Sequence, residues 1–230
     1  MENRLSFVVI IPARYASSRF PGKPLAKIGG KEMILHVCAR ASKAGYPVAV
    51  ATDDERIARC VEGGGYKAVM TSTDHKSGTD RVREAYEKLG IKADVVINVQ
   101  GDEPFIDPAQ IRSLAECFND EDSQIATLVR RFDPARGFEA LFDPSLVKVV
   151  FTDSMQALYF SRSIIPYVRR VDWRGWLKES EFHTHVGIYA YRVEALSAIT
   201  KLPQSSLELA ESLEQLRWLQ NGYKIKVALT

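Results

Sequence analysis

The chain has 230 residues, 46% of them hydrophobic and 26% charged, which is the range of a globular protein with a substantial core. The chain has 31 Lys and Arg against 29 Asp and Glu, which gives a formal net charge of +2. The composition therefore excludes a strong overall positive charge that would attract nucleic acid or an anionic membrane. Three scattered cysteines without a CxxC pair, no signal-peptide pattern and no run of about 18 apolar residues argue against a disulfide framework, export and membrane spanning, and favour the cytoplasm.

Short β-branched runs alternate with helical patterns through the first half of the chain. Strands are predicted at 6–11, 48–52, 67–70 and 94–99, and helices at 33–44, 54–62 and 78–89. This alternation predicts an α/β fold, with a mostly parallel mixed sheet flanked by helices on both faces. Ligands of such folds collect beyond the carboxyl ends of the strands. Residues just after Ile11, Ala51, Met70 and Val99 are therefore the first candidates for a site.

The second half of the chain has a looser pattern. Helices are predicted at 107–119 and 207–219, and strands at 126–132, 147–152, 157–161, 186–191 and 224–230. Residues 166–182, rich in charge and Trp, are expected to form a surface loop or an excursion that carries interface residues. We expect a single domain over 1–230, in which approximately residues 130–185 form a smaller inserted lobe.

The loop after the first predicted strand is locally cationic. Residues 12–31 contain no acidic residue, glycines at positions 22, 29 and 30, and the basic residues Arg14, Arg19, Lys23, Lys27 and Lys31. Glycine lets backbone N–H groups approach a polyphosphate closely, and Arg or Lys neutralises its oxygens. The spacing matches neither GxxxxGK[ST] nor GxGxxG. Phosphate binding is the favoured interpretation, and a merely solvated basic loop is the alternative.

An acidic turn follows the strand predicted at 94–99. Its sequence, NVQGDEP, places Asp102 directly after a glycine at the end of the strand. There the carboxylate can reach a divalent ion that is shared with substrate phosphates, which is the usual way in which Mg²⁺ is held. The alternative is that Asp102 only caps the helix that begins near Pro108.

The strand HVGIYAY alternates in character. His185, Gly187, Tyr189 and Tyr191 share one face, and the opposite face is expected to be core. A polar ligand wall with open space over Gly187 is one interpretation, and a structural histidine is the other.

The helix predicted at 207–219 also has two faces. Its packing stripe is predicted to be Leu209, Leu213 and Leu216. The opposite arc carries Glu211, Glu214, Gln215 and Trp218. Composition leaves two interpretations of that arc open, a solvated acidic face or a cluster that grips sugar hydroxyls.

Taken together and in this order, these segments resemble a known enzyme family. The matching blocks are RYASSRFPGKPL, VATDDERI, SGTDR, NVQGDEP, VKVVF, ALYFSR, HVGIYAYR and SLEQLR, spread over nearly the whole chain. One block alone is weak, but the set in register resembles the 3-deoxy-manno-octulosonate cytidylyltransferases. The resemblance implies a nucleotide-diphospho-sugar transferase-like (Rossmann-like) fold, a homodimer with a smaller dimerisation and sugar-side lobe, CTP and Mg²⁺ as ligands, and a place in lipopolysaccharide synthesis.

The resemblance also implies roles for individual residues. For the nucleotide and its metal they are Arg14, Arg19, Lys23, Ser77, Gly78 and Asp102, of which Arg14, Lys23 and Asp102 would be catalytic and Asp102 would hold the metal. For the sugar they are Arg81, Gln100, Arg162, His185, Tyr189, Glu214 and Gln215. Arginine suits a sugar carboxylate because its planar fork donates two parallel hydrogen bonds.

The implied reaction is a direct displacement. The anomeric 2-hydroxyl of 3-deoxy-manno-octulosonate (Kdo) would attack the α-phosphorus of CTP in line with the departing pyrophosphate, and Lys23 with Mg²⁺ would stabilise the growing charge. Members of the family usually continue past a strand like 224–230 into a segment with a further Asp that helps to bind metal. Because the sequence ends at Thr230, the number of metals stays open.

Three alternatives accompany this interpretation. The sugar could be the 8-amino analogue of Kdo, since a single residue can read one hydroxyl-to-amine change. A sialic acid is more distant, because the blocks SLEQLR and HVGIY resemble the Kdo branch. A protein of another class, a nucleotide-binding regulator that has lost catalysis, would bind CTP without releasing pyrophosphate.

Overall fold

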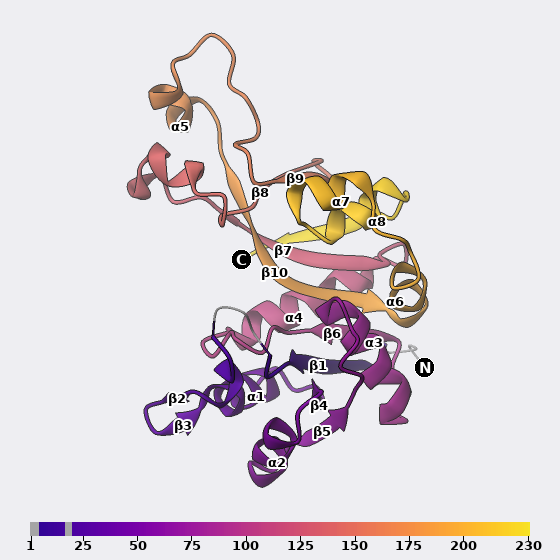
Figure 1. Ribbon diagram of the computed structural model, residues 1–230. Coiled ribbons are helices and arrows are strands. Elements are labelled where there is room, and N and C mark those ends of the chain that lie inside the picture. The colour runs from indigo at the N-terminus through magenta and orange to yellow at the C-terminus, as the bar shows by residue number, and fades with distance from the viewer. Residues whose placement is uncertain (1–4, 17–19) are drawn as a thin grey trace. The chain divides into compact units, whose positions relative to one another are not determined.

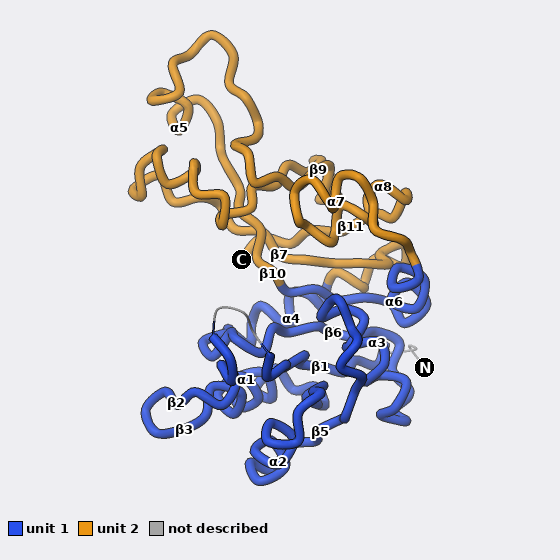
Figure 2. The backbone as a smooth tube through the Cα atoms, viewed as in Figure 1, with its two compact units in different colours: residues 1–116, 188–201 blue, residues 117–187, 202–230 orange. Residues whose placement is uncertain are grey.

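The computed structural model describes residues 5–16 and 20–230 (Figure 1). The strands are β1 (Phe7–Ala13), β2 (Lys27–Ile28), β3 (Lys31–Glu32), β4 (Val48–Thr52), β5 (Lys67–Met70), β6 (Val95–Asn98), β7 (Ile125–Arg131), β8 (Lys148–Phe151), β9 (Ala157–Ser161), β10 (His183–Arg192) and β11 (Ile225–Leu229). The α-helices are α1 (Met33–Ser42), α2 (Glu55–Gly63), α3 (Gly78–Leu89), α4 (Pro108–Glu116), α5 (Trp176–Glu179), α6 (Val193–Ile199), α7 (Ser206–Glu211) and α8 (Gln215–Gln220). The chain divides into two compact units, residues 1–116 with 188–201 (unit 1) and residues 117–187 with 202–230 (unit 2) (Figure 2).

Unit 1 is built on a mostly parallel sheet. Strands β6, β1, β4 and β5 are neighbours in that order and run parallel, and the second half of β10 pairs with β6 in the antiparallel sense. The residues Val8 to Ile11 and Val95 to Ile97 are all 0% exposed. Consecutive buried Val and Ile residues are typical of parallel strands that helices cover on both faces. Helix α1 packs on β1 and β4 beside α2 and α4, and α3 packs on β1, β4, β5 and β6 beside α6, which confirms the predicted fold class.

Unit 2 combines a parallel strand pair with an antiparallel hairpin. Strands β7 and β11 pair in parallel from Ile125 opposite Ile225. Strands β8 and β9 are antiparallel, and β8 meets the first half of β10 where Lys148 lies opposite Thr184. Unit 2 contains the lobe expected at 130–185 together with residues 117–129, 186–187 and 202–230.

The single helix predicted at 207–219 is wrong. The chain forms α7 and α8 instead, separated at Ser212, whose φ of 51° lies in the left-handed region. Ser205 and Glu208 open α7 with a capping box. Because the helical repeat cannot continue across a left-handed residue, the predicted faces are only partly right. Leu213 and Leu216 of the predicted packing stripe are buried, at 7% and 0% exposed. Leu209 is 61% exposed, whereas Trp218 is 1% exposed and belongs to the core.

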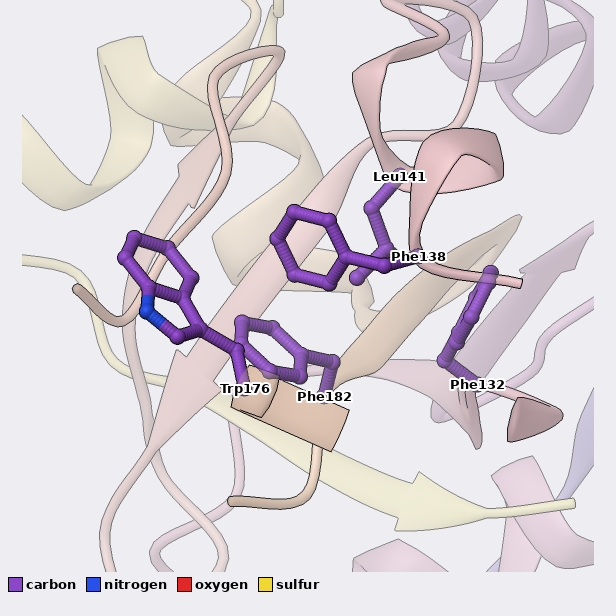
Figure 3. Packing of buried hydrophobic residues seen from close by; sticks show 5 residues of the cluster. All are labelled: Phe132, Phe138, Leu141, Trp176 and Phe182. Carbon is purple, nitrogen blue, oxygen red and sulfur yellow. The ribbon is translucent and has the colours of Figure 1, made fainter. Parts of the chain in front are cut away.

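Residues 166–182 are more than a surface loop. Trp176 and Phe182 belong to a buried cluster with Phe132, Phe138 and Leu141 (Figure 3). The ring of Phe138 lies 5.4 Å from that of Trp176 and 6.0 Å from that of Phe182, and both pairs are edge-to-face. This segment of unit 2 therefore shares an apolar core with residues 132–141.

Within the described part of the chain, no disulfide joins Cys38, Cys60 or Cys117. Burial raises the pKa of Cys38 to about 12, which keeps this thiol protonated and unreactive. No helix among residues 5–16 and 20–230 has both the length and the apolar composition that crossing a bilayer requires.

Candidate active site

The cationic loop after β1 closes on itself. The N–H of Gly22 donates to the carbonyl of Tyr15 at 2.9 Å, and Gly22 has a φ of 71°. A Cβ at this position would be strained and would lie 3.0 Å from the Tyr15 ring, so the turn requires glycine. The Arg56 guanidinium lies 3.5 Å from the centroid of the Tyr15 ring. Lys23 directly follows this turn in the sequence. Arg19, also predicted in this loop, lies outside the described residues.

Lys23 and Asp102, predicted from separate motifs, meet in unit 1. Nζ of Lys23 lies 2.6 Å from Oδ2 of Asp102, and the two side chains are 36% and 52% exposed. Because both groups face water, the pair contributes little to stability. Each group of such a pair can change its partner. The ammonium can bind a phosphate oxygen instead, and the carboxylate can bind a metal.

Gly101 holds the turn of Asp102 against the end of β1. A Cβ on Gly101 would lie 2.7 Å from the carbonyl oxygen of Pro12 and 3.4 Å from the Cβ of Ala13. The nearest of these atoms is backbone and cannot swing away as a flexible side chain would. Glycine at this position therefore sets the spacing between the acidic turn and the loop that begins at Arg14.

We expect Gly101→Ala to destabilise the protein by about 1–3 kcal/mol, because the added methyl group must push the turn away from Pro12. Urea unfolding measures the change. Gly187→Ala is the matched control, since a Cβ on Gly187 meets no heavy atom of the described residues within 4 Å. That space over Gly187 also agrees with the prediction made for the strand HVGIYAY. Equal unfolding midpoints for the two variants would contradict the close approach.

The segment between β5 and α3 is fixed at both ends. The hydroxyl of Thr71 donates to the carbonyl of Thr52 at 3.1 Å. The side chain of Ser77 caps α3 by accepting from the N–H of Asp80 at 3.1 Å. The first helical residue is Gly78, which carries no side chain, so the positive end of the helix dipole stays accessible to an anion.

A cavity of about 210 Å³ in unit 1 brings several predicted residues together. It is lined by Pro12, Ala13, Arg14, His75, Lys76, Ser77, Gly78, Arg81 and Gln100. These residues come from the loop after β1, the start of α3 and the turn after β6. The described lining contains cationic side chains and no carboxylate, which suits an anionic ligand.

Arg81 is buried in unit 1 and held by protein groups. One terminal nitrogen donates to Oγ1 of Thr71 at 2.6 Å, and the other donates to Oδ2 of Asp53 at 2.7 Å. The residue is 4% exposed. The pair ties α3 to the residues that follow β4, a connection that sequence reasoning missed. The contact of Arg81 with a sugar stays a prediction.

Tyr189 and Tyr191 lie on the same face of β10, as predicted. Their rings stack at 5.9 Å with an interplanar angle of 13°. Ile188 and Ala190 on the opposite face are buried as well, at 1% and 0% exposed. The prediction that a single face of this strand is core is therefore wrong for its second half, because both faces are covered.

In unit 2, Arg162 clamps backbone carbonyls. Its guanidinium donates to the carbonyl oxygens of Glu211 at 2.6 Å, Pro144 at 2.8 Å and Ser212 at 3.2 Å. The backbone N–H of Arg162 donates to Oε2 of Glu211 at 2.8 Å. Arg162 thus fixes the turn at Ser212 that precedes α8, and its role toward a sugar stays a prediction.

Glu214 and Gln215 stand at the start of α8. The guanidinium of Arg217 lies 2.9 Å from Oε1 of Glu208 and 3.4 Å from Oε1 of Glu214. Gln215 is 5% exposed, and its Nε2 has no hydrogen-bond partner within the described residues. A buried donor without a partner is costly, and an acceptor oxygen of a ligand would remove that cost.

His185 of unit 2 contacts Thr127. Nε2 of His185 lies 3.0 Å from Oγ1 of Thr127, and that hydroxyl donates to the carbonyl of Val186 at 3.3 Å. The imidazole then donates from Nε2, which a neutral ring can do. The ring also meets Phe160 edge-on, with centroids 5.1 Å apart. Burial lowers the pKa of His185 from 6.5 to about 3.

This lowered pKa predicts a pH-dependent stability. An imidazole that stays neutral in the folded state leaves stability at its full value above pH 6.5, and this contribution is lost as pH falls from 6.5 toward 3. We expect the group to account for about 2 kcal/mol less stability at pH 5 than at pH 7.5, and His185→Gln to lose that component. Burial lowers the pKa of His183 too, so the difference between wild type and variant in urea unfolding isolates His185. An identical pH dependence in both proteins would contradict the assignment.

Two further polar residues of unit 2 make contacts that the sequence analysis did not predict. Lys148 on β8 is 0% exposed, its Nζ donates to the carbonyl of Asp143 at 3.2 Å, and burial lowers its pKa. Glu211 accepts from the hydroxyl of Ser161 at 2.6 Å. The signal for Lys148 was a single Lys inside the apolar strand VKVVF. Glu211 was predicted on an arc that was either a solvated acidic face or a sugar-binding cluster, and neither interpretation predicted its contact with Ser161.

A divalent metal fits Asp102 in one specific way. No group of three or more His, Cys, Asp or Glu that could hold a metal occurs among the residues described. A lone exposed carboxylate supplies one oxygen ligand, which suits a metal that keeps several waters and takes other ligands from phosphates. The donor set fits Mg²⁺ accompanying a nucleotide and does not resemble a structural zinc site.

Comparisons with known proteins identify the family to which the chain is similar. The profile of the family described as Cytidylyltransferase matches residues 8–225. A 3-deoxy-manno-octulosonate cytidylyltransferase of Phocaeicola vulgatus is 57% identical over 226 residues, covering 98% of this chain and 90% of the relative. An 8-amino-3,8-dideoxy-manno-octulosonate cytidylyltransferase of Shewanella sediminis is 47% identical over 229 residues, covering 98% and 91%. A solved structure of CMP:2-keto-3-deoxy-manno-octonic acid synthetase complexed with CTP has a TM-score of 0.89 at 46% identity, covering 98% of this chain and 90% of that one.

Proposed function

The chain belongs to the cytidylyltransferase family, and we propose that it transfers CMP from CTP to Kdo and releases pyrophosphate. The observation that carries the proposal is the 57% identity, over 98% of the chain, to a relative named for this transfer. The product, CMP-Kdo, serves lipopolysaccharide synthesis.

The reaction is an in-line displacement. The 2-hydroxyl oxygen of Kdo forms a bond to the α-phosphorus of CTP and gives up its proton to water. The bond from that phosphorus to the bridging oxygen of the β-phosphate breaks, and that oxygen leaves with pyrophosphate. The protein contributes positioning and charge neutralisation. Arg14 and Lys23 bind triphosphate oxygens, while Ser77 and Gly78 lie against the nucleoside. Arg19 is proposed to join the triphosphate contacts.

Membership in a nucleotidyltransferase family implies a divalent metal, and Mg²⁺ on Asp102 is our proposal. When bound, Mg²⁺ supplies positive charge to the phosphate oxygens. Asp102 would hold the metal in place of its contact with Lys23, and the ammonium of Lys23 would be available to the triphosphate. The exposed pair at 2.6 Å supports this exchange, since neither group would lose buried contacts.

We propose the sugar-binding residues of each unit separately, from the contacts described above. In unit 1 they are Arg81, Gln100 and Tyr189, and in unit 2 they are Arg162, His185, Glu214 and Gln215. The buried amide nitrogen of Gln215 without a partner among the described residues supports a polar ligand in unit 2.

A homodimer in the cytoplasm is the proposed working form. Within the lobe 130–185, Tyr167 is 75% exposed and Phe142 is 57% exposed, and both line a cavity of about 740 Å³. Exposed aromatic residues of this kind are enriched at protein interfaces. Sedimentation should show two copies, whereas a monomer at every concentration would rule the dimer out.

Pyrophosphate release with different sugars tests the function. Purified protein receives CTP, Mg²⁺ and one of three acceptors: Kdo, its 8-amino analogue or a sialic acid. We expect release with Kdo. Strong release with the amine and none with Kdo would overturn the choice of sugar. Binding of CTP without release for any acceptor would indicate a nucleotide-binding regulator.

A further inference from the structure

His75 lies between two cavities of unit 1. It lines the cavity of about 210 Å³ that also contains Arg14 and Ser77. It also lines a second cavity of about 450 Å³, together with Asp74, Lys76, Asp80, Arg83, Glu84, Glu87 and Thr200. The reaction described above gives His75 no task.

Glu84, in the second turn of α3, binds His75. Oε2 of Glu84 contacts Nε2 of His75 and also accepts from the backbone N–H of Ser72 at 2.9 Å. Oε1 of Glu84 lies 2.6 Å from Nζ of Lys88. Burial by itself would raise the pKa of Glu84, but the hydrogen bonds from Lys88, Ser72 and His75 together lower it to about 2. Glu84 is therefore an ionised acceptor at neutral pH.

These contacts fix the segment 72–77 along its length. Ser72 is bound through its backbone, His75 through its side chain, and Ser77 through the cap of α3. The hydroxyl of Ser72 also accepts from the N–H of Asp74 at 3.1 Å. The His75 contact lies in the middle of the segment, and its loss would leave the stretch between Asp74 and Ser77 without its link to Glu84.

We propose that His75 is a positioning residue for the nucleotide. Its bond to Glu84 holds the segment 72–77 in the wall of the smaller cavity, so that Ser77 and Gly78 meet the nucleoside in an arrangement formed beforehand. The inference rests on the proposed binding of CTP in that cavity. A preformed wall reduces the ordering that binding requires, so losing it weakens the affinity for CTP. The residues proposed to bind the sugar lie outside the segment 72–77, so the KM for Kdo should not change.

Kinetics and calorimetry of His75 variants test the proposal. We expect His75→Ala to raise both the KM and the Kd for CTP about tenfold, with kcat within about threefold of wild type and the KM for Kdo unchanged. His75→Gln should recover most of the affinity, because its amide nitrogen can donate to Glu84 where Nε2 does. Glu87→Gln is the matched control. Glu87 pairs with Arg83 on the same helix and lines the larger cavity but not the smaller one.

The possible outcomes distinguish failure of the positioning role of His75 from failure of the proposed function. Wild-type affinity for CTP in His75→Ala would overturn the positioning role, and so would failure of His75→Gln to recover affinity while its thermal midpoint matches wild type. If the wild-type protein binds CTP but turns over no Kdo, the proposed function fails. The calorimetric comparison with CTP alone still decides the role of His75 in that case.

Discussion

Asp102→Asn is expected to lower kcat by about a thousandfold or more while the fold stays intact. The side chain is 52% exposed and pairs with Lys23, so the amide replaces it without a loss of core packing. The amide lacks the negative charge that a divalent metal needs from this position. Steady-state pyrophosphate release with CTP and Kdo measures the effect, and circular dichroism checks the fold.

Glu103→Gln is the control for this variant. It makes the same carboxylate-to-amide change at the neighbouring exposed position of the same turn. We expect it to keep activity within about threefold of wild type. Near-normal rates in Asp102→Asn, or equal losses in both variants, would remove Asp102 from the metal site.

Lys23→Met is expected to reduce kcat/KM for CTP by a factor of about 100 to 1,000, because the triphosphate loses an ammonium partner while negative charge develops on the departing pyrophosphate. Its Nζ lies 2.6 Å from Asp102, in the turn after β6. Initial rates at varied CTP concentration measure the effect.

Lys27→Met removes another ammonium from the same loop and is the control. Lys27 is 64% exposed, and its Nζ lies 3.7 Å from Oε1 of Glu32, whereas Nζ of Lys23 lies beside Asp102. Its kcat/KM should stay within about threefold of wild type. The double variant Lys23→Met with Asp102→Asn should lose less than the product of the single losses, since the two groups act on the same triphosphate. Strictly multiplicative losses would contradict a shared role.

Unit 1 could be predicted from the sequence because its strands are short apolar runs separated by amphipathic helices. Every residue of β6 is buried, so its position in a covered parallel sheet follows from composition. The break at Ser212 could not be predicted, because a serine with a φ of 51° carries no signal in the apolar period. The cluster of Trp176 with Phe138 was hidden as well, since it joins residues from separate charged segments.

Part of the candidate site could also be predicted from the sequence, and part of it could not. Lys23 and Asp102 follow the ends of β1 and β6, which are neighbouring parallel strands, so topology brings the two motifs to one edge. The pairs Arg81 with Asp53 and His75 with Glu84 were not predicted. Their members are 28 and 9 residues apart and lie on different elements, and periodicity does not specify the partner of a polar side chain.

Transfer of label from CTP to Kdo tests the central claim most directly. The protein is incubated with Mg²⁺, Kdo and CTP that carries ³²P in the α-phosphate, and the products are separated and weighed by mass spectrometry. We expect the label in CMP-Kdo, with one pyrophosphate released for each molecule formed. Label that remains in CTP, or that appears in CMP or CDP without any sugar conjugate, would contradict the claim.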